Sequence, residues 1–140
     1  MIIGLGLDTV EIERFEKWHT YKRKQLARIF SKEEIDYCLQ YQTTSAERFA
    51  VRFAAKEALF KAANTVASIS FLHLCKMSNV HHDHHGQARM TILDSYYRKL
   101  GSPTISISLT HSRTIASAIV ILDSSERANP LLAFVDKALI

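Results

Sequence analysis

The chain has 140 residues, of which 47% are hydrophobic, enough to bury one substantial core but too few for two ordinary domains. Its formal net charge of +4 favours anionic partners, a class that includes nucleotides, nucleic acid, anionic lipid and acidic proteins. No run of about 18 apolar residues is present, which argues against a membrane-spanning helix, and Asp8 follows the N-terminus too soon for a signal peptide. We therefore expect one cytoplasmic globular domain.

The first predicted element is a short buried strand from Ile2 to Leu7. Gly4 and Gly6 interrupt its apolar side chains and leave room for another backbone to approach closely. Asp8 follows directly, so the strand is predicted to present a carboxylate at its end.

Two helical segments are predicted next. Apolar residues recur at every third position: Ile12, Phe15 and Trp18. With basic residues around the other side, this pattern predicts an amphipathic helix over residues 11–23. Ser31 then provides an N-cap and Glu34 stands at the capping-box position, which predicts a short helix through Leu39.

The longest predicted helix runs from about Ala46 to Ala63, with Thr44 or Ser45 as its cap. Its spacing sorts the side chains into faces. Cations recur every four residues at Arg48, Arg52 and Lys56, phenylalanines line an adjoining side at Phe49, Phe53 and Phe60, and Glu57 precedes Lys61 by one turn.

Two interpretations fit this helix. In the first, it has a solvated cationic stripe, a core face and one weak Glu57–Lys61 ion pair. In the second, the cations contact phosphates and Glu57 binds a metal ion. Magnesium suits the second interpretation, because this ion keeps several waters and is usually held by one or two carboxylates plus phosphate oxygens. Asp8 is the candidate for the second carboxylate, although spacing alone does not bring it to Glu57.

Beyond this helix the pattern predicts mostly strands. We expect strand character over 69–80, a polar turn over 81–86, a returning strand over 88–93, a helix over 94–100, and strands over 105–110 and 115–122 joined by a turn at 111–113. Residues 123–129 form a polar break, and 131–140 form a short amphipathic helix or a loose tail. These elements predict an α+β fold, with an antiparallel sheet packed against one long helix.

Two groups of metal-ligand residue types are interpreted without a metal. The histidines of residues 81–85 occupy adjacent and alternate positions on a tight turn, where they cannot all face one ion, so a solvated hairpin tip is favoured over a metal site. Cys38 and Cys75 lack CxxC spacing and are expected to be buried, reduced thiols.

Three stretches together closely resemble the motifs of the holo-[acyl-carrier-protein] synthase family, the short, trimeric type of 4′-phosphopantetheinyl transferase. They are Gly6-Leu7-Asp8-Thr9-Val10-Glu11-Ile12, Arg52-Phe53-Ala54-Ala55-Lys56-Glu57-Ala58 with Lys61 after it, and Ile107-Ser108-Leu109-Thr110-His111-Ser112. Their order and separation fit as well. The resemblance covers residues 1–122, predicted as the transferase domain, and leaves 123–140 as a C-terminal extension of unknown role.

The resemblance implies an enzyme that transfers the 4′-phosphopantetheine arm of coenzyme A to a serine of an acidic acyl carrier protein, in lipid and fatty-acid biosynthesis. Asp8 and Glu57 match the ligands of a Mg²⁺ ion that bridges the coenzyme A diphosphate. The carrier serine attacks the β-phosphorus, and 3′,5′-ADP leaves. Glu57 is the candidate proton acceptor and Lys61 neutralises phosphate charge, so Asp8, Glu57 and Lys61 are the predicted catalytic residues.

The resemblance also implies a homotrimer with coenzyme A between subunits. One subunit supplies Asp8 and Glu57, and its neighbour supplies the strand that ends at His111. The predicted coenzyme A contacts are Arg48, Arg52, Phe53, Lys56, Ser108 and His111. Residues 11–23 would receive an acidic helix of the carrier protein, with Arg14, Lys17, Lys22 and Arg23 as the predicted binding residues.

The chain departs from the family pattern after Lys61, where a glycine-rich turn is usual and this sequence has Asn64-Thr65-Val66-Ala67. A non-catalytic module that binds coenzyme A or a carrier protein is therefore an alternative to the enzyme. A small nucleic-acid binder is suggested only by the charge, and the sequence lacks the aromatic-basic strand motif or groove-reading helix of that class. We expect neither nucleic acid nor a membrane among the partners.

Overall fold

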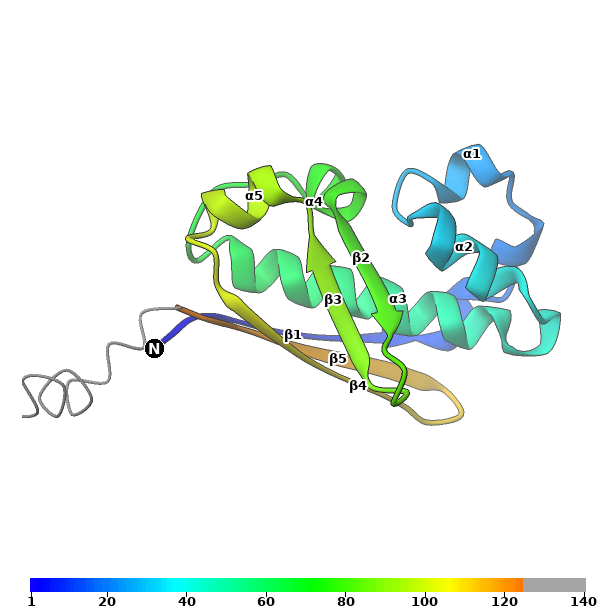
Figure 1. Cartoon of the computed structure of the whole chain (residues 1–140). Coiled ribbons are helices and arrows are strands. Elements are labelled where there is room, and N and C mark those ends of the chain that lie inside the picture. The colour runs from blue at the N-terminus through cyan, green and yellow to red at the C-terminus, as the bar shows by residue number, and fades with distance from the viewer. Residues whose placement is uncertain (125–140) are drawn as a thin grey trace, which may run out of the picture.

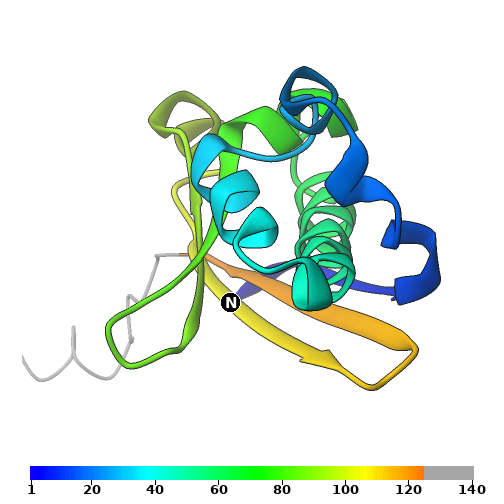
Figure 2. The ribbon, with the colours of Figure 1, turned by 90° about the vertical axis from the view of Figure 1, so that its right-hand side faces the viewer.

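A long helix, α3 (Gln42–Ala63), lies along a three-stranded antiparallel sheet in this computed structural model, which describes residues 1–124 (Figure 1). The strands in order across the sheet are β1 (Ile2–Glu11), β5 (Ile115–Asp123) and β4 (Thr104–His111). In the view turned by 90°, the helices gather on one side of this sheet (Figure 2). The predicted α+β fold, with an antiparallel sheet against one long helix, is confirmed.

Side chains alternate across the sheet, as expected for strands with one buried face. The buried residues of β5 belong to the same hydrophobic core as the buried side chains of α3; they are Ala116, Ala118, Val120 and Leu122. Asp8 pairs with Ala118 in the register of β1 and β5, so it belongs to the face that meets α3. The prediction that Asp8 ends the strand is wrong, because pairing with β5 extends β1 to Glu11.

Two glycines of β1 let α3 approach the sheet closely. A Cβ atom added to Gly6 would overlap the carbonyl oxygen of Ala58, and one added to Gly4 would overlap that of Ala62. Any side chain at either position would push the strand off the helix. The predicted close backbone approach is therefore confirmed, and the element that approaches is α3.

The segment after β1 differs from the predicted helix over 11–23. It forms two 3₁₀ turns, Ile12–Phe15 and Trp18–Thr20, followed by the short helix α1 (Arg23–Leu26). A spacing of three fits the 3.0 residues per turn of a 3₁₀ helix better than the 3.6 of an α-helix. Phe15 is fully buried, and its ring centroid lies 4.5 Å from that of Trp18.

Helix α2 (Lys32–Leu39) begins with the predicted capping box. The backbone N–H of Glu34 donates to Ser31 Oγ over 3.1 Å, and the backbone N–H of Ser31 donates to Glu34 Oε2 over 2.7 Å. Helix α3 begins at Gln42, four residues before the predicted start.

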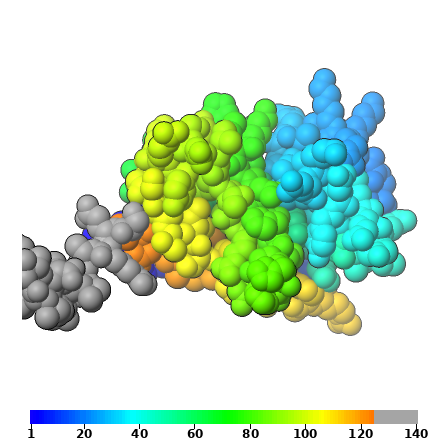
Figure 3. Space-filling view, in the orientation of Figure 1, coloured from blue at the N-terminus to red at the C-terminus, as the bar shows by residue number. Residues whose placement is uncertain are grey.

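The second half of the described chain contains a hairpin, β2 (Ser78–His82) and β3 (Ala88–Ile92), between α4 (Phe71–Met77) and α5 (Asp94–Lys99). The strand predicted over 69–80 is correct only from Ser78 onward. Its first part is helical, because the Ser70 hydroxyl caps α4 by accepting from the backbone N–H of His73. The surface of the hairpin lies between the α1–α2 segment and the α5–β4 segment (Figure 3).

Three further predictions concern single features. Cys38 and Cys75 are free and buried, as predicted. No helix within residues 1–124 is long and apolar enough to cross a membrane. The helix or tail predicted over 131–140 lies outside the described residues.

Candidate functional site

Asp8 and Lys61 form an ion pair where β1 crosses α3. The Lys61 Nζ atom lies 2.9 Å from Asp8 Oδ1 and donates a second hydrogen bond to the backbone oxygen of Leu7, also over 2.9 Å. The Lys61 side chain is 50% exposed, whereas that of Asp8 is only 15% exposed. The pair therefore lies at the surface, with the carboxylate set into it.

Glu57 precedes Lys61 by one turn of α3 and lies near Asp8. Burial, and next the Asp8 carboxylate, raise the pKa of Glu57 above its usual range, while Lys61 and Arg14 lower it. Within residues 1–124, Glu57 makes no hydrogen bond or ion pair of its own. Two neighbouring carboxylates and two cations thus share a half-buried site, which we call the carboxylate site (Asp8, Glu57, Lys61 and Arg14).

The carboxylate site fits a magnesium ion. Two carboxylates supply the hard oxygen ligands that this ion prefers, and water and phosphate oxygens usually fill its other positions. The mutual repulsion of Asp8 and Glu57, seen in the raised pKa of Glu57, would be relieved by a cation between them. No group of three or more histidine, cysteine or acidic residues that could hold a metal ion occurs within residues 1–124, so this pair would need water and phosphate oxygens to complete the shell of the ion.

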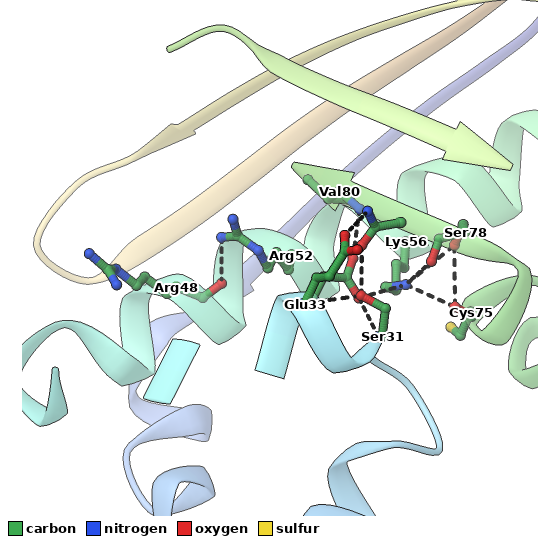
Figure 4. Close-up of polar contacts among 10 residues, drawn as sticks. Ser31, Glu33, Arg48, Arg52, Lys56, Cys75, Ser78 and Val80 are labelled. Atoms are coloured by element: carbon green, nitrogen blue, oxygen red, sulfur yellow. Dashed lines mark hydrogen bonds and ion pairs between the residues drawn. The ribbon is translucent and has the colours of Figure 1, made fainter. Parts of the chain in front are cut away.

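Lys56, predicted to contact coenzyme A, is buried instead. Its Nζ atom lies 3.1 Å from Glu34 Oε2 and donates to the backbone oxygens of Cys75 and Ser78, each over 2.8 Å. Both charged side chains are 0% exposed. Figure 4 shows Lys56 enclosed where α3 meets α2 and β2. The assignment of Lys56 to a phosphate cleft does not fit this position, because protein groups take up its donors.

The partner carboxylate of this pair is equally well bonded. Glu34 Oε1 accepts from the backbone N–H of Val80 over 2.7 Å, and Glu34 Oε2 accepts from that of Ser31. Burial lowers the pKa of Lys56, and the adjacent Glu34 carboxylate opposes this shift. We call the two residues the buried clamp, because they tie α2, α3 and β2 together.

The other two cations of the stripe, Arg48 and Arg52, line a pocket beside the N-terminal half of α3. This arginine pocket brings Arg48 and Arg52 together with His111 at the end of β4. Its remaining lining residues are Tyr37, Glu47, Val51, His82, Leu109 and Thr110. His111 Nε2 lies 3.2 Å from Glu47 Oε1. Three of the predicted coenzyme A contacts therefore meet in one cavity of one chain.

The carboxylate site and the arginine pocket occupy different faces of α3. Arg52 and Glu57 are five residues apart, so their side chains diverge by about 140° around the helix axis. Arg52 and Lys61 diverge by about 180°. A single chain therefore does not close the two sites around one small ligand.

Phe53 and Ser108 are the remaining predicted contacts. Phe53 is half-buried in an aromatic cluster, with its ring centroid 5.4 Å from that of Phe15 and the Arg14 guanidinium 5.6 Å away. It therefore borders the carboxylate site. Ser108 is exposed and pairs with Ile119, which puts it on the face of the sheet opposite to His111. Ser108 is thus not part of the arginine pocket.

The predicted carrier-binding residues lie on the 3₁₀ segment and α1. Arg14, Lys17, Lys22 and Arg23 are all exposed. Arg23 is paired with Asp36 of α2, so its charge is partly neutralised within the chain. Arg14 has the closest link to the carboxylate site, because its charge lowers the pKa of Glu57.

The turn after Lys61 is held by side chains in place of glycines. Asn64 Nδ2 donates to the backbone oxygens of Phe60 and Ile69 over 2.9 and 3.3 Å. Thr65 Oγ1 lies 2.9 Å from the backbone oxygen of Ile3. These contacts give the chain a defined turn beside the carboxylate site despite its departure from the family pattern.

Sequence reasoning missed Glu34 as the partner of Lys56, and it missed Tyr37, Glu47 and His82 in the arginine pocket. The capping-box position of Glu34 was visible, but a capping glutamate gives no sign that a distant lysine shares its carboxylate. A charged residue in the middle of an alanine-rich stretch was the one available signal for Lys56.

Sequence comparison identifies the relatives of this chain. Residues 4–119 match the model of the 4′-phosphopantetheinyl transferase superfamily. The chain is 41% identical to a holo-[acyl-carrier-protein] synthase of Treponema denticola, over 88% of this chain and 99% of that protein.

Solved structures agree as well. A Bacillus anthracis holo-(acyl-carrier-protein) synthase in complex with CoA (3′,5′-ADP) superposes with a TM-score of 0.72 and 29% identity, covering 89% of this chain and 99% of that one. A Helicobacter pylori holo-[acyl-carrier-protein] synthase in complex with coenzyme A has a TM-score of 0.68 and 27% identity, covering 85% and 99%. The chain therefore belongs to the holo-[acyl-carrier-protein] synthase family of 4′-phosphopantetheinyl transferases.

Proposed function

We propose that this chain transfers the 4′-phosphopantetheine arm of coenzyme A to the serine of an apo acyl carrier protein. The hydroxyl oxygen of that serine forms a bond to the β-phosphorus, the bond from this phosphorus to the bridging oxygen breaks, and 3′,5′-ADP leaves. The observation that carries the proposal is the carboxylate site, where Asp8, Glu57 and Lys61 converge in a chain of this family.

The residues of the carboxylate site suit such a transfer. Phosphoryl transfer needs mainly alignment of the reactants and neutralisation of charge on the phosphate oxygens. Lys61 supplies a cation at the surface, already oriented by Asp8 and the backbone of Leu7. Glu57 is the candidate for accepting the serine proton, directly or through a bound water.

Asp8 and Glu57 would hold the magnesium ion. When bound, the ion would supply positive charge to the diphosphate oxygens. Lys61 is paired with Asp8, so it would help to hold that carboxylate in place and would add its own positive charge for the phosphates. Val10 lies two residues beyond Asp8, and its buried hydrocarbon side chain has no oxygen to offer as a further ligand.

We further propose that copies of this chain associate through the uncovered face of the sheet, as a homotrimer. Leu5 and Leu7 are 55% and 60% exposed on β1 and lie opposite Ile121 and Ile119 of β5. A contiguous apolar patch of this kind is typical of an interaction surface. Association would let the arginine pocket of one chain face the carboxylate site of its neighbour, which the divergence around α3 prevents within one chain.

The carrier protein would bind the exposed basic segment that contains Arg14, Lys17, Lys22 and Arg23. Complementary charge acts mainly on the encounter rate and on selectivity, and it weakens with salt. Arg14 links this surface to the carboxylate site. We propose fatty-acid synthesis as the pathway and the cytoplasm as the location.

A direct experiment tests the transfer. Purified protein is incubated with coenzyme A, magnesium chloride and an apo acyl carrier protein, and the intact mass of the carrier is measured. We expect a gain of one phosphopantetheine group that is lost when the carrier serine is replaced by alanine. No gain with several acidic carriers would favour the non-catalytic binding module. Binding of DNA or RNA in a filter assay is not expected.

A further inference from the structure

Tyr37 lies where two guanidinium groups of α3 meet the last turn of α2. The Cζ atom of Arg48 is 4.0 Å from the centroid of the Tyr37 ring, and the Cζ atom of Arg52 is 4.2 Å from it. At this range a guanidinium is attracted to the electron-rich face of an aromatic ring. One ring thus contacts both arginines of the arginine pocket.

Neither arginine has a carboxylate partner within residues 1–124. Arg48 Nη1 donates to the backbone oxygen of Tyr37 over 2.7 Å and to Gln40 Oε1 over 3.1 Å. Arg52 is only 3% exposed, yet its Nε atom has no hydrogen-bond partner, and its Nη1 reaches the backbone oxygen of Arg48 only over 3.5 Å. A buried guanidinium with unused donors indicates a missing acceptor.

The one carboxylate of the pocket does not fill this role. Glu47 is paired with His111. His82 forms another wall, with its ring 5.9 Å from that of Tyr37, and it adds no negative charge. Two cations with free N–H groups and no anion between them match the oxygens of a phosphate group.

The backbone of Tyr37 belongs to a helix that the buried clamp anchors. Tyr37 follows Glu34 by three residues, so both face the same side of α2. Glu34 is held by Lys56 and by the backbone of Val80. Arg52 lies one turn before Lys56 on α3, and its guanidinium contacts the Tyr37 ring. The buried clamp therefore anchors the turn of α2 that carries Tyr37. The Tyr37 ring in turn contacts two long side chains whose like charges repel each other.

We propose that Tyr37 is a positioning residue for phosphate binding, whose ring holds Arg48 and Arg52 with their free N–H groups in the arginine pocket. The inference rests on the proposed function, in which coenzyme A is the ligand with the phosphate. It adds a residue outside the three family motifs to the binding of that substrate. Tyr37 touches the arginines and acts on the substrate through them.

Two substitutions separate the ring from the hydroxyl. Tyr37→Leu removes the aromatic face, while Tyr37→Phe keeps it and serves as the matched control. By titration calorimetry with coenzyme A, we expect the dissociation constant of Tyr37→Leu to rise about tenfold and that of Tyr37→Phe to change less than about twofold. In the transfer assay, the KM for coenzyme A should rise in parallel, while kcat and the KM for the carrier stay nearly unchanged.

A double-mutant cycle tests whether Tyr37 acts through the arginines. In an Arg48→Gln, Arg52→Gln background, Tyr37→Leu should weaken coenzyme A binding no further, because there are no guanidinium groups left to position. Thermal melting of each variant checks that it folds. Unchanged affinity in a folded Tyr37→Leu protein, or full additivity in the cycle, would overturn the inference.

The result also distinguishes this inference from the proposed function. If coenzyme A binding depends on Tyr37 but no apo carrier is modified, the proposed transfer activity is contradicted and the positioning role of Tyr37 is supported. A wild-type protein that does not bind coenzyme A at all would overturn both.

Discussion

The buried clamp and the carboxylate site each combine a lysine of α3 with carboxylates, but in opposite surroundings. Lys56 and Glu57 are neighbours in sequence, but the side chains of Lys56 and Glu34 are 0% exposed, whereas that of Lys61 is 50% exposed. In the clamp, protein groups bond to both charges. In the carboxylate site, Glu57 is left without a partner within residues 1–124. The paired charges of the clamp therefore stabilise the fold. The Glu57 carboxylate, unpaired within the described residues, remains available to bind a ligand.

The largest expected effect follows from neutralising the carboxylate site. Asp8→Asn and Glu57→Gln should each lower kcat by about a thousandfold, because each removes the charge of one of the two carboxylates proposed to hold the magnesium ion. The transfer rate is measured from the mass of the carrier. Thermal melting should change little, since both substitutions keep the size and shape of the side chain. Turnover near that of the wild type in either variant would exclude the metal assignment.

The clamp should respond in the opposite way, with a loss of stability. Lys56→Met leaves the Glu34 carboxylate buried without its partner, which is expected to lower the free energy of unfolding by about 3–5 kcal/mol. Urea denaturation measures this loss. The double variant Glu34→Leu, Lys56→Met removes both charges and should recover much of the stability. If Lys56→Met instead remained stable and lost coenzyme A affinity, Lys56 would belong with the phosphate contacts after all.

A substitution at Gly6 tests whether close packing of β1 on α3 is what brings Asp8 near Glu57. Gly6→Ala inserts a methyl group against the backbone of Ala58 and should lower the free energy of unfolding by about 1–3 kcal/mol. Since β1 must move away from α3, transfer should also fall. Glu11→Ala, at the exposed end of the same strand, is the control, with an expected change within about 0.5 kcal/mol. Equal stability of the two variants would contradict the close approach.

The thiols near the clamp give a pH test. Burial raises the pKa of both Cys38 and Cys75 to about 12. The folded protein therefore retains these protons where the unfolded chain, with thiol pKa values near about 8.5, has lost them. The resulting stabilisation is complete below that value and is lost as the pH rises toward 12.

For each thiol, the free energy of unfolding should fall by about 1.4 kcal/mol per pH unit within this window. Cys38→Ser should show a shallower fall in urea titrations at pH 9 and pH 10.5. A thiol reagent at pH 8 should label both cysteines only after denaturation, and rapid labelling of the native protein would contradict their burial.

The smallest expected effect concerns the exposed basic segment. Lys17→Glu with Lys22→Glu should lower kcat/KM for the carrier a few-fold at low salt, and the difference should vanish at about 0.5 M salt, where exposed charges are screened. The KM for coenzyme A should not change. A salt-independent defect would mean that these lysines do not meet the carrier by charge.

The sequence by itself determined the elements with strong local signals. The Ser31 capping box, the alternation in β4 and the alanine-rich α3 depend on contacts within a few residues, so they could be predicted. The 3₁₀ segment could not, because periods of 3.0 and 3.6 differ little over so short a stretch. The motifs that contain Asp8, Glu57 and His111 were likewise visible, since their order along the chain carries the family resemblance.

Only the tertiary structure decided what each charge does. Arg48, Arg52 and Lys56 form one stripe in sequence, yet α2 buries the last of them against Glu34 and leaves the first two in a pocket. Spacing along a helix fixes the direction of a side chain but not what lies opposite. The groups opposite each side chain depend on two contacts between segments that are distant in the chain. Gly6 lets α3 pack closely on β1, and Glu34 holds α2 against β2.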